Sequence, residues 1–259
     1  MKSPAEIAQN YIKVAQGKTT QKWYKLLTLA VLAGAFIAFG AAVATTAGAY
    51  ASNAALVKGL VFPVGLILVV VCGSELFTGN CLLISPLIGK DIKVGGFFKN
   101  LGIVYAGNFL GGLLIAVFVV YSHVQNQTVA EACVAAAALK SNMGFGEALL
   151  RGILCNMLVC LAVWASMASS STAGKILAMY LPVLAFVVCG FEHSVANMYY
   201  LSAGLMAGVE YGITAAGLTV GNALLYCLLP STIGNIIGGF LIGGAYHTVY
   251  RTKMPKAEQ

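Results

Sequence analysis

The chain has 259 residues, of which 59% are hydrophobic and 9% are charged, and its formal net charge is +7 at pH 7. A soluble domain of this length does not normally carry such a composition, which is typical of an integral membrane protein. The positive charge does not indicate a nucleic-acid-binding protein, because the basic residues gather at the chain ends and in short loops instead of alternating with aromatic residues.

Residues 1–25 form the first predicted element. Ser3, Pro4 and Glu6 match a capping box with proline at the first helical position, and apolar residues then recur at helical spacing. We expect a short amphipathic helix and a linker at the cytoplasmic surface, ahead of the first membrane span.

Six apolar segments between residues 26 and 250 are expected to cross the membrane. The second breaks at Gly73 and resumes at Cys81, the fifth breaks at Phe191, and Pro230 interrupts the sixth. The stretch 123–146 is interpreted as a longer connection. The expected segments are residues 26–49, 60–88, 101–121, 148–168, 176–207 and 218–246.

The distribution of basic residues gives the orientation. With six spans both chain ends lie on one side, and all but three of the 15 lysines and arginines fall on that side. The three on the opposite side are Lys58, Lys140 and Arg151. By the positive-inside rule we expect cytoplasmic N and C termini, including a cytoplasmic tail at residues 251–259.

A repeat of three spans divides the membrane domain into two halves. The pattern V-V-C-G-x-E-x-x-x-x-N occurs at residues 70–80 and again at 187–197, and G-N-x-x-G-G occurs at 107–112 and again at 234–239. Because three is odd, the halves enter the membrane from opposite faces, so the fold is expected to be an all-α inverted repeat whose two broken helices meet near the midplane. Close packing of transmembrane backbones explains the paired glycines.

Each break carries a glutamate, Glu75 or Glu192, just after the helix end. We expect these carboxylates to accept backbone N–H groups that the broken helix leaves without partners, and we favour this role over ligand binding. The copies differ where Leu76 of the first is replaced by His193 in the second. A histidine in such a loop, facing Thr78 of the other copy, can hydrogen-bond an anion or exchange a proton with it.

The two loops closely resemble the two signatures of the formate/nitrite transporter family, and the resemblance spans nearly the whole chain. The matching stretches are E-L-F-T-G-N at residues 75–80 and G-F-E-H-S-V-A-N-M at residues 190–198. Within that family the chain looks most like the hydrosulfide-channel branch. The resemblance implies an aquaporin-like protomer, a homopentamer, and a separate substrate pore through each protomer.

The resemblance also implies roles for individual residues. His193 and Thr78 are expected to form a central polar pair with Asn156 nearby, and Lys140 is expected to be the cation of the outer vestibule. Apolar constrictions on either side of the pair are expected at Phe62, Leu66, Leu76, Phe77, Val159 and Phe186. The residues expected to support the two loops are Glu75, Glu192, Asn80 and Asn197.

The predicted function is a channel or facilitator for small monovalent anions of weak acids, namely hydrosulfide, formate and nitrite, in the lipid bilayer of a bacterial inner membrane. We expect no enzymatic activity and no cofactor, and the seven cysteines form no C-x-x-C pair that would indicate a metal site. An aquaporin-like facilitator of small neutral solutes is the alternative, although the paired Asn-Pro-Ala motifs are absent. An intramembrane hydrolase would need an activated nucleophile, and Ser194 beside His193 is only a proximity in sequence.

Overall fold

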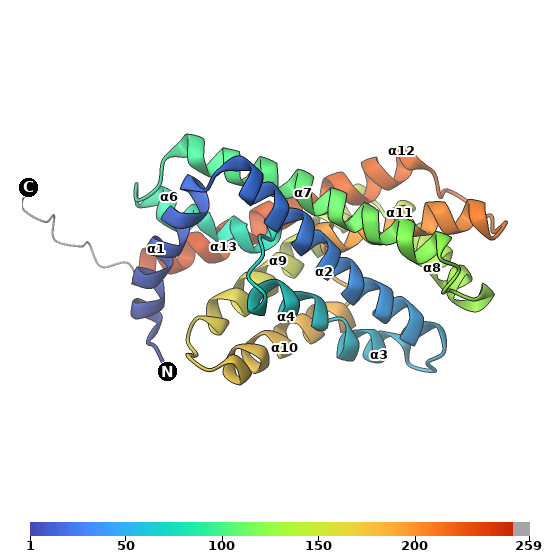
Figure 1. Cartoon of the computed structure of the whole chain (residues 1–259), viewed down its shortest axis with the longest axis horizontal. Coiled ribbons are helices and arrows are strands. Elements are labelled where there is room, and N and C mark those ends of the chain that lie inside the picture. Colours follow the sequence, from blue (N-terminus) through green and yellow to red (C-terminus); the bar gives the residue numbers. More distant parts are fainter. Residues whose placement is uncertain (251–259) are drawn as a thin grey trace, which may run out of the picture.

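A computed structural model describes residues 1–250, and the predicted cytoplasmic tail at residues 251–259 lies outside the described part. The described residues form helices joined by short connections, with no strand among them (Figure 1). The helices of the first half are α1 (Pro4–Thr20), α2 (Trp23–Ala49), α3 (Ala54–Val61), α4 (Val64–Val71), α5 (Phe77–Asn80), η1 (Cys81–Leu83), α6 (Ile84–Ile88) and α7 (Val94–Tyr121). Those of the second half are α8 (Gln127–Ser141), α9 (Phe145–Ser166), α10 (Thr172–Val188), α11 (Ser194–Glu210), α12 (Val220–Asn222), η2 (Ala223–Leu228) and α13 (Leu229–Tyr250).

Most of the expected spans are present as long apolar helices. Within the described residues, five helices are long and apolar enough to cross a membrane, counting α3 with α4 and α12 with α13 as continuous pieces. The fifth expected segment is divided between α10 and α11, which have 17 residues each and meet at a short loop. The all-helical fold class is confirmed. The fifth segment does not appear as one long helix because it is broken between α10 and α11.

The two halves are each built on one close pair of helices, α2 with α7 and α9 with α13. The repeated glycines make these pairs possible. A Cβ added at Gly111 of α7 would collide with the carbonyl oxygen of Val31, and one added at Gly238 of α13 would collide with that of Ile153. The G-N-x-x-G-G repeat therefore lets two backbones touch, as small residues do in membrane proteins.

Both broken helices stop at a glycine in the left-handed region. Gly73 follows α4 with φ +77° and Gly190 follows α10 with φ +69°, a conformation that glycine adopts without steric cost. The helices resume earlier than predicted, at Phe77 and at Ser194. The sequence did not show this because the first N–H groups of α5 and α11 are accepted by asparagine side chains from distant helices, Asn108 of α7 and Asn235 of α13.

One further prediction about the helices was incomplete, and another was wrong. The expected connection at 123–146 contains α8, which starts at an Asn126 cap whose side chain accepts the N–H of Val129 at 3.1 Å. Its small residues bury one face. The last span is not interrupted at Pro230, because the preceding π-helical turn η2 absorbs the bond that proline cannot make.

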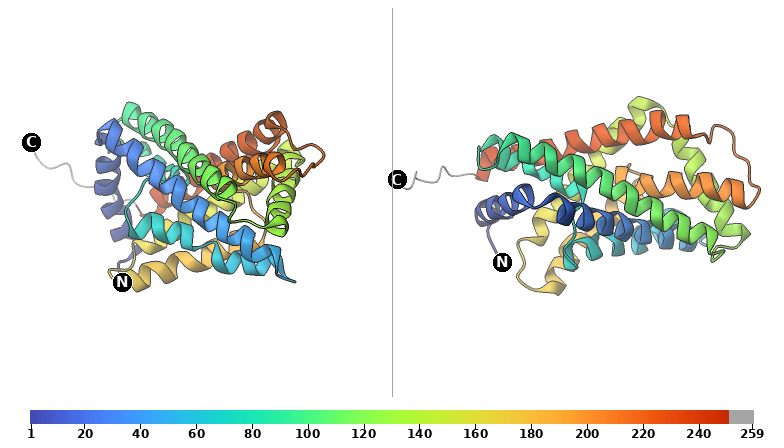
Figure 2. Two further views of the ribbon diagram at one scale, coloured as in Figure 1. Left: turned by 45° about the vertical axis from the view of Figure 1, so that its right-hand side comes forward. Right: turned by 45° about the horizontal axis from the view of Figure 1, so that its top comes forward.

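The predicted N-terminal helix is confirmed as α1, with a complete capping box between Ser3 and Glu6. It packs against α6, α7 and α13 at one end of the molecule. The other end carries α8, which packs against α2, η2 and α11. Figure 2 shows these two short helices at opposite ends of the bundle, as an inverted repeat requires.

Candidate functional site

The two loops bring Thr78 and His193 into contact at the centre of the molecule. Thr78 lies in the first turn of α5 and His193 is the N-cap of α11, and both side chains are buried. Thr78 Oγ1 and His193 Nε2 are 2.8 Å apart. The structure therefore joins the two residues that were predicted to form a polar pair, one from each half.

The hydrogen bonds of His193 assign its tautomer. Nδ1 accepts the backbone N–H of Ala196 at 3.1 Å, so in the neutral ring the proton sits on Nε2. Nε2 then donates to the Thr78 hydroxyl oxygen, which leaves the hydroxyl proton of Thr78 free to be donated elsewhere. The pair thus presents a free hydroxyl donor, which suits an anion passing between the loops.

Asn156 of α9 lies directly beside this pair. Its Nδ2 group donates to the backbone oxygen of Thr78 at 3.1 Å and to that of Asn235. The amide therefore ties the first loop to α9 and α13. Asn156 thus lies beside the central pair, as expected, and its N–H groups donate to backbone carbonyls.

Two asparagines that the sequence analysis did not single out hold the loops in place. Asn108 of α7 accepts the N–H of Phe77 at 2.9 Å and donates to the carbonyls of Ala30 and Glu75 at 2.7 and 3.0 Å. The contacts with Phe77 and Glu75 satisfy backbone groups that the break leaves without a helical partner, and the contact with Ala30 ties the loop to α2. The asparagine of the repeated G-N-x-x-G-G motif was the available signal for this role.

Asn235 of α13 does the same in the second half. It accepts the N–H of Ser194 at 2.9 Å and donates to the carbonyls of Gly152 and Glu192 at 2.8 and 2.9 Å. The expectation that the glutamates accept these first N–H groups is therefore wrong, since the acceptors are asparagine side chains.

The glutamates instead form ion pairs with lysines from α1 and α8. Lys18 Nζ of α1 lies 2.7 Å from Glu75, and Lys140 Nζ of α8 lies 2.7 and 2.9 Å from the two carboxylate oxygens of Glu192. Because each helix supplies one base to one loop, the pairs are equivalent under the repeat. Lys18 was missed because nothing in its local sequence shows where α1 docks.

An asparagine completes each pair. Asn80 and Asn197 each donate to the glutamate of their own loop at 2.7 Å. Both glutamate side chains are at most 10% exposed, so their charges need these partners. The four residues predicted to support the loops thus lie together in two matching clusters.

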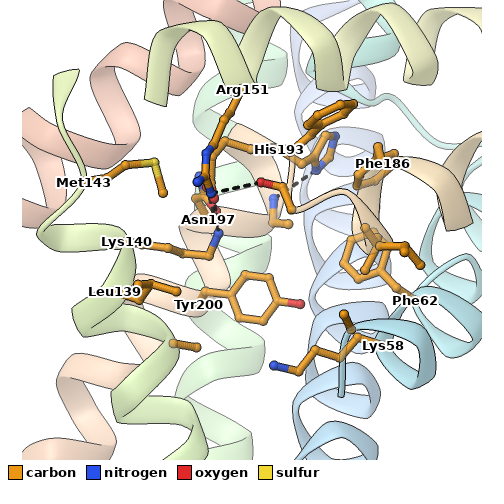
Figure 3. A pocket seen from close by; sticks show the side chains of 18 of the residues that line it. Lys58, Phe62, Leu139, Lys140, Met143, Arg151, Phe186, His193, Asn197 and Tyr200 are labelled. Atoms are coloured by element: carbon orange, nitrogen blue, oxygen red, sulfur yellow. Dashed lines mark hydrogen bonds and ion pairs between the residues drawn. The ribbon is translucent and has the colours of Figure 1, made fainter. Parts of the chain in front are cut away.

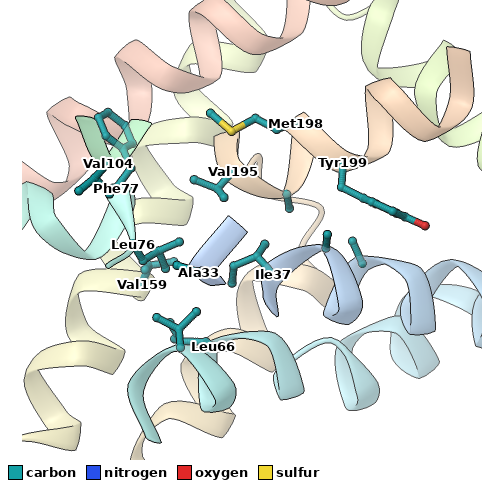
Figure 4. Packing of buried hydrophobic residues seen from close by; sticks show 14 of the residues in the cluster. Ala33, Ile37, Leu66, Leu76, Phe77, Val104, Val159, Val195, Met198 and Tyr199 are labelled. Atoms are coloured by element: carbon teal, nitrogen blue, oxygen red, sulfur yellow. The ribbon is translucent and has the colours of Figure 1, made fainter. Parts of the chain in front are cut away.

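The predicted apolar residues lie near the central pair, and all six are buried. The ring of Phe186 stacks on His193 with centroids 5.8 Å apart and meets the edge of Phe62 at 5.7 Å. Figure 4 shows Leu66, Leu76 and Val159 gathered on the buried side of α4. The side chains of these three residues and the rings of Phe62 and Phe186 are apolar, so they offer no hydrogen bond to a solute.

A cavity of about 550 Å³ borders Phe62 and Phe186 and is bounded by α3, α8, α10 and α11. We call it the vestibule. Helices α3 and α8, which bound it, lie in the half of the molecule opposite α1 (Figure 1). Figure 3 shows Phe62, Phe186 and His193 at one side of it. Its charged lining residues are Lys58, Lys140, Arg151 and Glu192. The vestibule therefore leads from charged side chains to the rings of Phe62 and Phe186, which we call the apolar floor. Behind this floor lies the Thr78 and His193 pair.

A family model described as formate/nitrite transporter matches residues 5–249. The chain is 38% identical over 263 residues to the uncharacterized transporter YrhG of Bacillus subtilis, covering 97% of this chain and 95% of that protein. It is 38% identical over 268 residues to the formate channel FocA of Escherichia coli K12, covering 95% and 94%.

Solved structures show the same architecture. An FNT family ion channel superposes with a TM-score of 0.79 at 28% identity, over 94% of this chain and 96% of that one. A pentameric formate channel with formate bound superposes with a TM-score of 0.78 at 30% identity, over 88% and 96%.

Proposed function

Because this chain belongs to the formate/nitrite transporter family, we propose that it is a channel for small monovalent anions of weak acids, with formate as its first substrate. The observation that carries the proposal is the Thr78 and His193 pair at the end of the vestibule, where buried donors follow an apolar floor. The homologues are transporters and channels, so the chain is a membrane transporter and not an enzyme.

Formate ranks first because the relatives named above include a formate channel and a solved channel with formate bound. Nitrite and hydrosulfide have the same charge and similar size, and they remain the next candidates. The pentameric relative supports a homopentamer with one pore in each protomer. The gathering of basic residues on the side of α1 supports cytoplasmic termini in a bacterial inner membrane.

The proposed path uses the apolar floor as a barrier to charge. An anion at Phe62 and Phe186 loses water without gaining hydrogen bonds, whereas its neutral acid loses much less. Beyond the rings the anion meets the hydroxyl proton of Thr78, which the hydrogen bond from His193 Nε2 leaves free. This donor stabilises the anion. When the ring has taken up a second proton, the imidazolium can transfer a proton to the anion and return to the neutral imidazole, so that the neutral acid continues along the path.

The function is tested by flux in proteoliposomes. We expect saturable formate uptake, slower uptake of chloride, and no swelling in glycerol. Comparing formate, nitrite and hydrosulfide in the same vesicles ranks the substrates. Swelling in glycerol without formate uptake would contradict the proposal and support the aquaporin-like alternative.

Replacing Phe186 by Ala is expected to weaken selection between anions. Without the ring, the floor opens beside Phe62 and His193, so acetate uptake should rise about tenfold relative to formate, the scale at which a pocket discriminates one carbon. The measurement is the ratio of acetate to formate uptake. Leu177→Ala is the control, because Leu177 lies on the same helix and is 70% exposed. An unchanged ratio with a less stable oligomer would make Phe186 a packing residue only.

A further inference from the structure

We propose that Lys58 of α3 is the cation that binds the entering anion in the vestibule, with the Tyr200 hydroxyl as its second donor, so that Lys140 serves the loop instead. The site would take a small monovalent carboxylate or oxyanion such as formate. This inference rests on the proposed channel function and adds an anion site at the pore entrance.

The three cations of the vestibule differ in their partners. Lys140 is bound to both carboxylate oxygens of Glu192, and Arg151 pairs with Glu147 one turn earlier on α9. Within residues 1–250, Lys58 is the vestibule cation for which the structure shows no ion pair. The charge of each paired cation is cancelled close by, so the positive potential that an anion meets comes mainly from Lys58.

The fold makes room for the Lys58 side chain at a glycine. A lysine near the end of a membrane helix ordinarily extends along the helix surface into the interface. Here the stem lies across Gly48 of α2, where an added Cβ would collide with Lys58 Cε and would lie 2.9 Å from Cγ. Figure 3 shows the side chains of Lys58 and Tyr200 directed into the vestibule, which both residues line.

Tyr200 of α11 supplies the second donor. Its ring lies under the Lys140 ammonium group, with Nζ 5.3 Å from the ring centroid, and this contact fixes the direction of the phenol. No hydrogen bond of the Tyr200 hydroxyl is found within the part of the chain that the structure describes, and the residue lines the cavity. The hydroxyl is therefore available to an anion held by Lys58.

The position of Lys58 along α3 places the proposed anion site next to the apolar floor. Phe62 follows Lys58 by four residues, so the two side chains lie on one face of the helix, one turn apart. An anion at Lys58 is thus one helical turn from the apolar floor. Binding there raises the anion concentration at the point where it must lose its water.

The test is initial formate uptake by proteoliposomes as a function of formate concentration and ionic strength. Lys58→Met removes the charge and keeps the length, and we expect about a three- to tenfold higher half-saturating concentration at low salt, with little change in maximal flux. The difference should shrink at high salt. Lys58→Arg should restore the wild-type value.

Two matched variants separate charge from position. Gly48→Ala keeps the Lys58 charge but displaces its stem, so it should raise the half-saturating concentration in the same direction. Lys13→Met removes an exposed charge on α1, at the opposite end, and should change nothing. Thermal unfolding of each purified oligomer shows that the fold is retained.

The outcomes are distinguishable from a failure of the proposed function. If wild-type protein transports formate and Lys58→Met keeps the same half-saturation and salt dependence, the Lys58 site is refuted and the channel function stands. If wild-type protein transports no formate, the proposed function falls, and the anion site falls with it.

Discussion

Replacing His193 by Asn is expected to remove the pH dependence of formate uptake while leaving uptake itself measurable. Asparagine is a good N-cap and an amide donor, so it can keep the bond from Ala196 and offer an N–H to Thr78 or the anion. It cannot titrate between pH 5 and 8, as an imidazole can.

The hydrogen bonds of His193 give the direction of the effect. Protonating Nδ1 breaks its bond from the Ala196 N–H, whereas an anion beside the ring stabilises the imidazolium. Binding of the anion and uptake of a proton are therefore coupled, and wild-type uptake should rise as the pH falls. The variant should show a flat profile across that range once the bulk concentration of neutral acid is held constant.

Two controls accompany the His193 measurement. His123→Asn changes an exposed histidine, 3.5 Å from Glu210, and should leave the pH profile unchanged. Thr78→Val removes a hydroxyl but no titrating group, so it should weaken substrate selection and keep the pH response. A wild-type profile in His193→Asn would leave this residue with a hydrogen-bonding role alone.

Replacing Lys140 by Met is expected to destabilise the protein by about 3–5 kcal/mol, because it leaves the Glu192 carboxylate buried without a counter-charge. The measurement is the thermal unfolding of the purified oligomer. The double variant Lys140→Met with Glu192→Gln removes both charges, so it should recover much of the loss. Asn197 can still hydrogen-bond the glutamine.

The exposed pair between Arg151 and Glu147 provides the comparison. Its side chains are 40% and 50% exposed, so Glu147→Gln should change stability by less than about 1 kcal/mol. If Lys140→Met unfolds like the wild type and only raises the half-saturating formate concentration, Lys140 is the attracting cation that the family resemblance implies. The ion pair would then have no structural role.

The sequence was sufficient for the plan of the fold because its repeats and apolar runs are local signals. The two V-V-C-G patterns predict where the helices break, and Gly73 and Gly190 show why. Helix α8 was missed because its alanines and polar residues bury only a narrow face against α11. Such packing is decided by tertiary structure and leaves little periodicity in the sequence.

The candidate site was predictable where a residue sits inside a recognisable loop, as His193 and Thr78 do. The partners that fix the loops come from elsewhere in the chain. Lys18 reaches Glu75 only because α1 docks beneath the first loop, and Asn108 reaches Phe77 from the middle of α7. Neither contact follows from spacing, since each depends on how two helices pack.

In both ion pairs the lysine comes before the glutamate in the chain, which matters for insertion into the membrane during synthesis. Synthesis runs from the N-terminus, so Lys18 is made before Glu75, and Lys140 is made before Glu192. A carboxylate that enters a bilayer alone is costly. In both halves the lysine precedes its glutamate in the chain, so it is available to neutralise the acidic loop once that loop has been made.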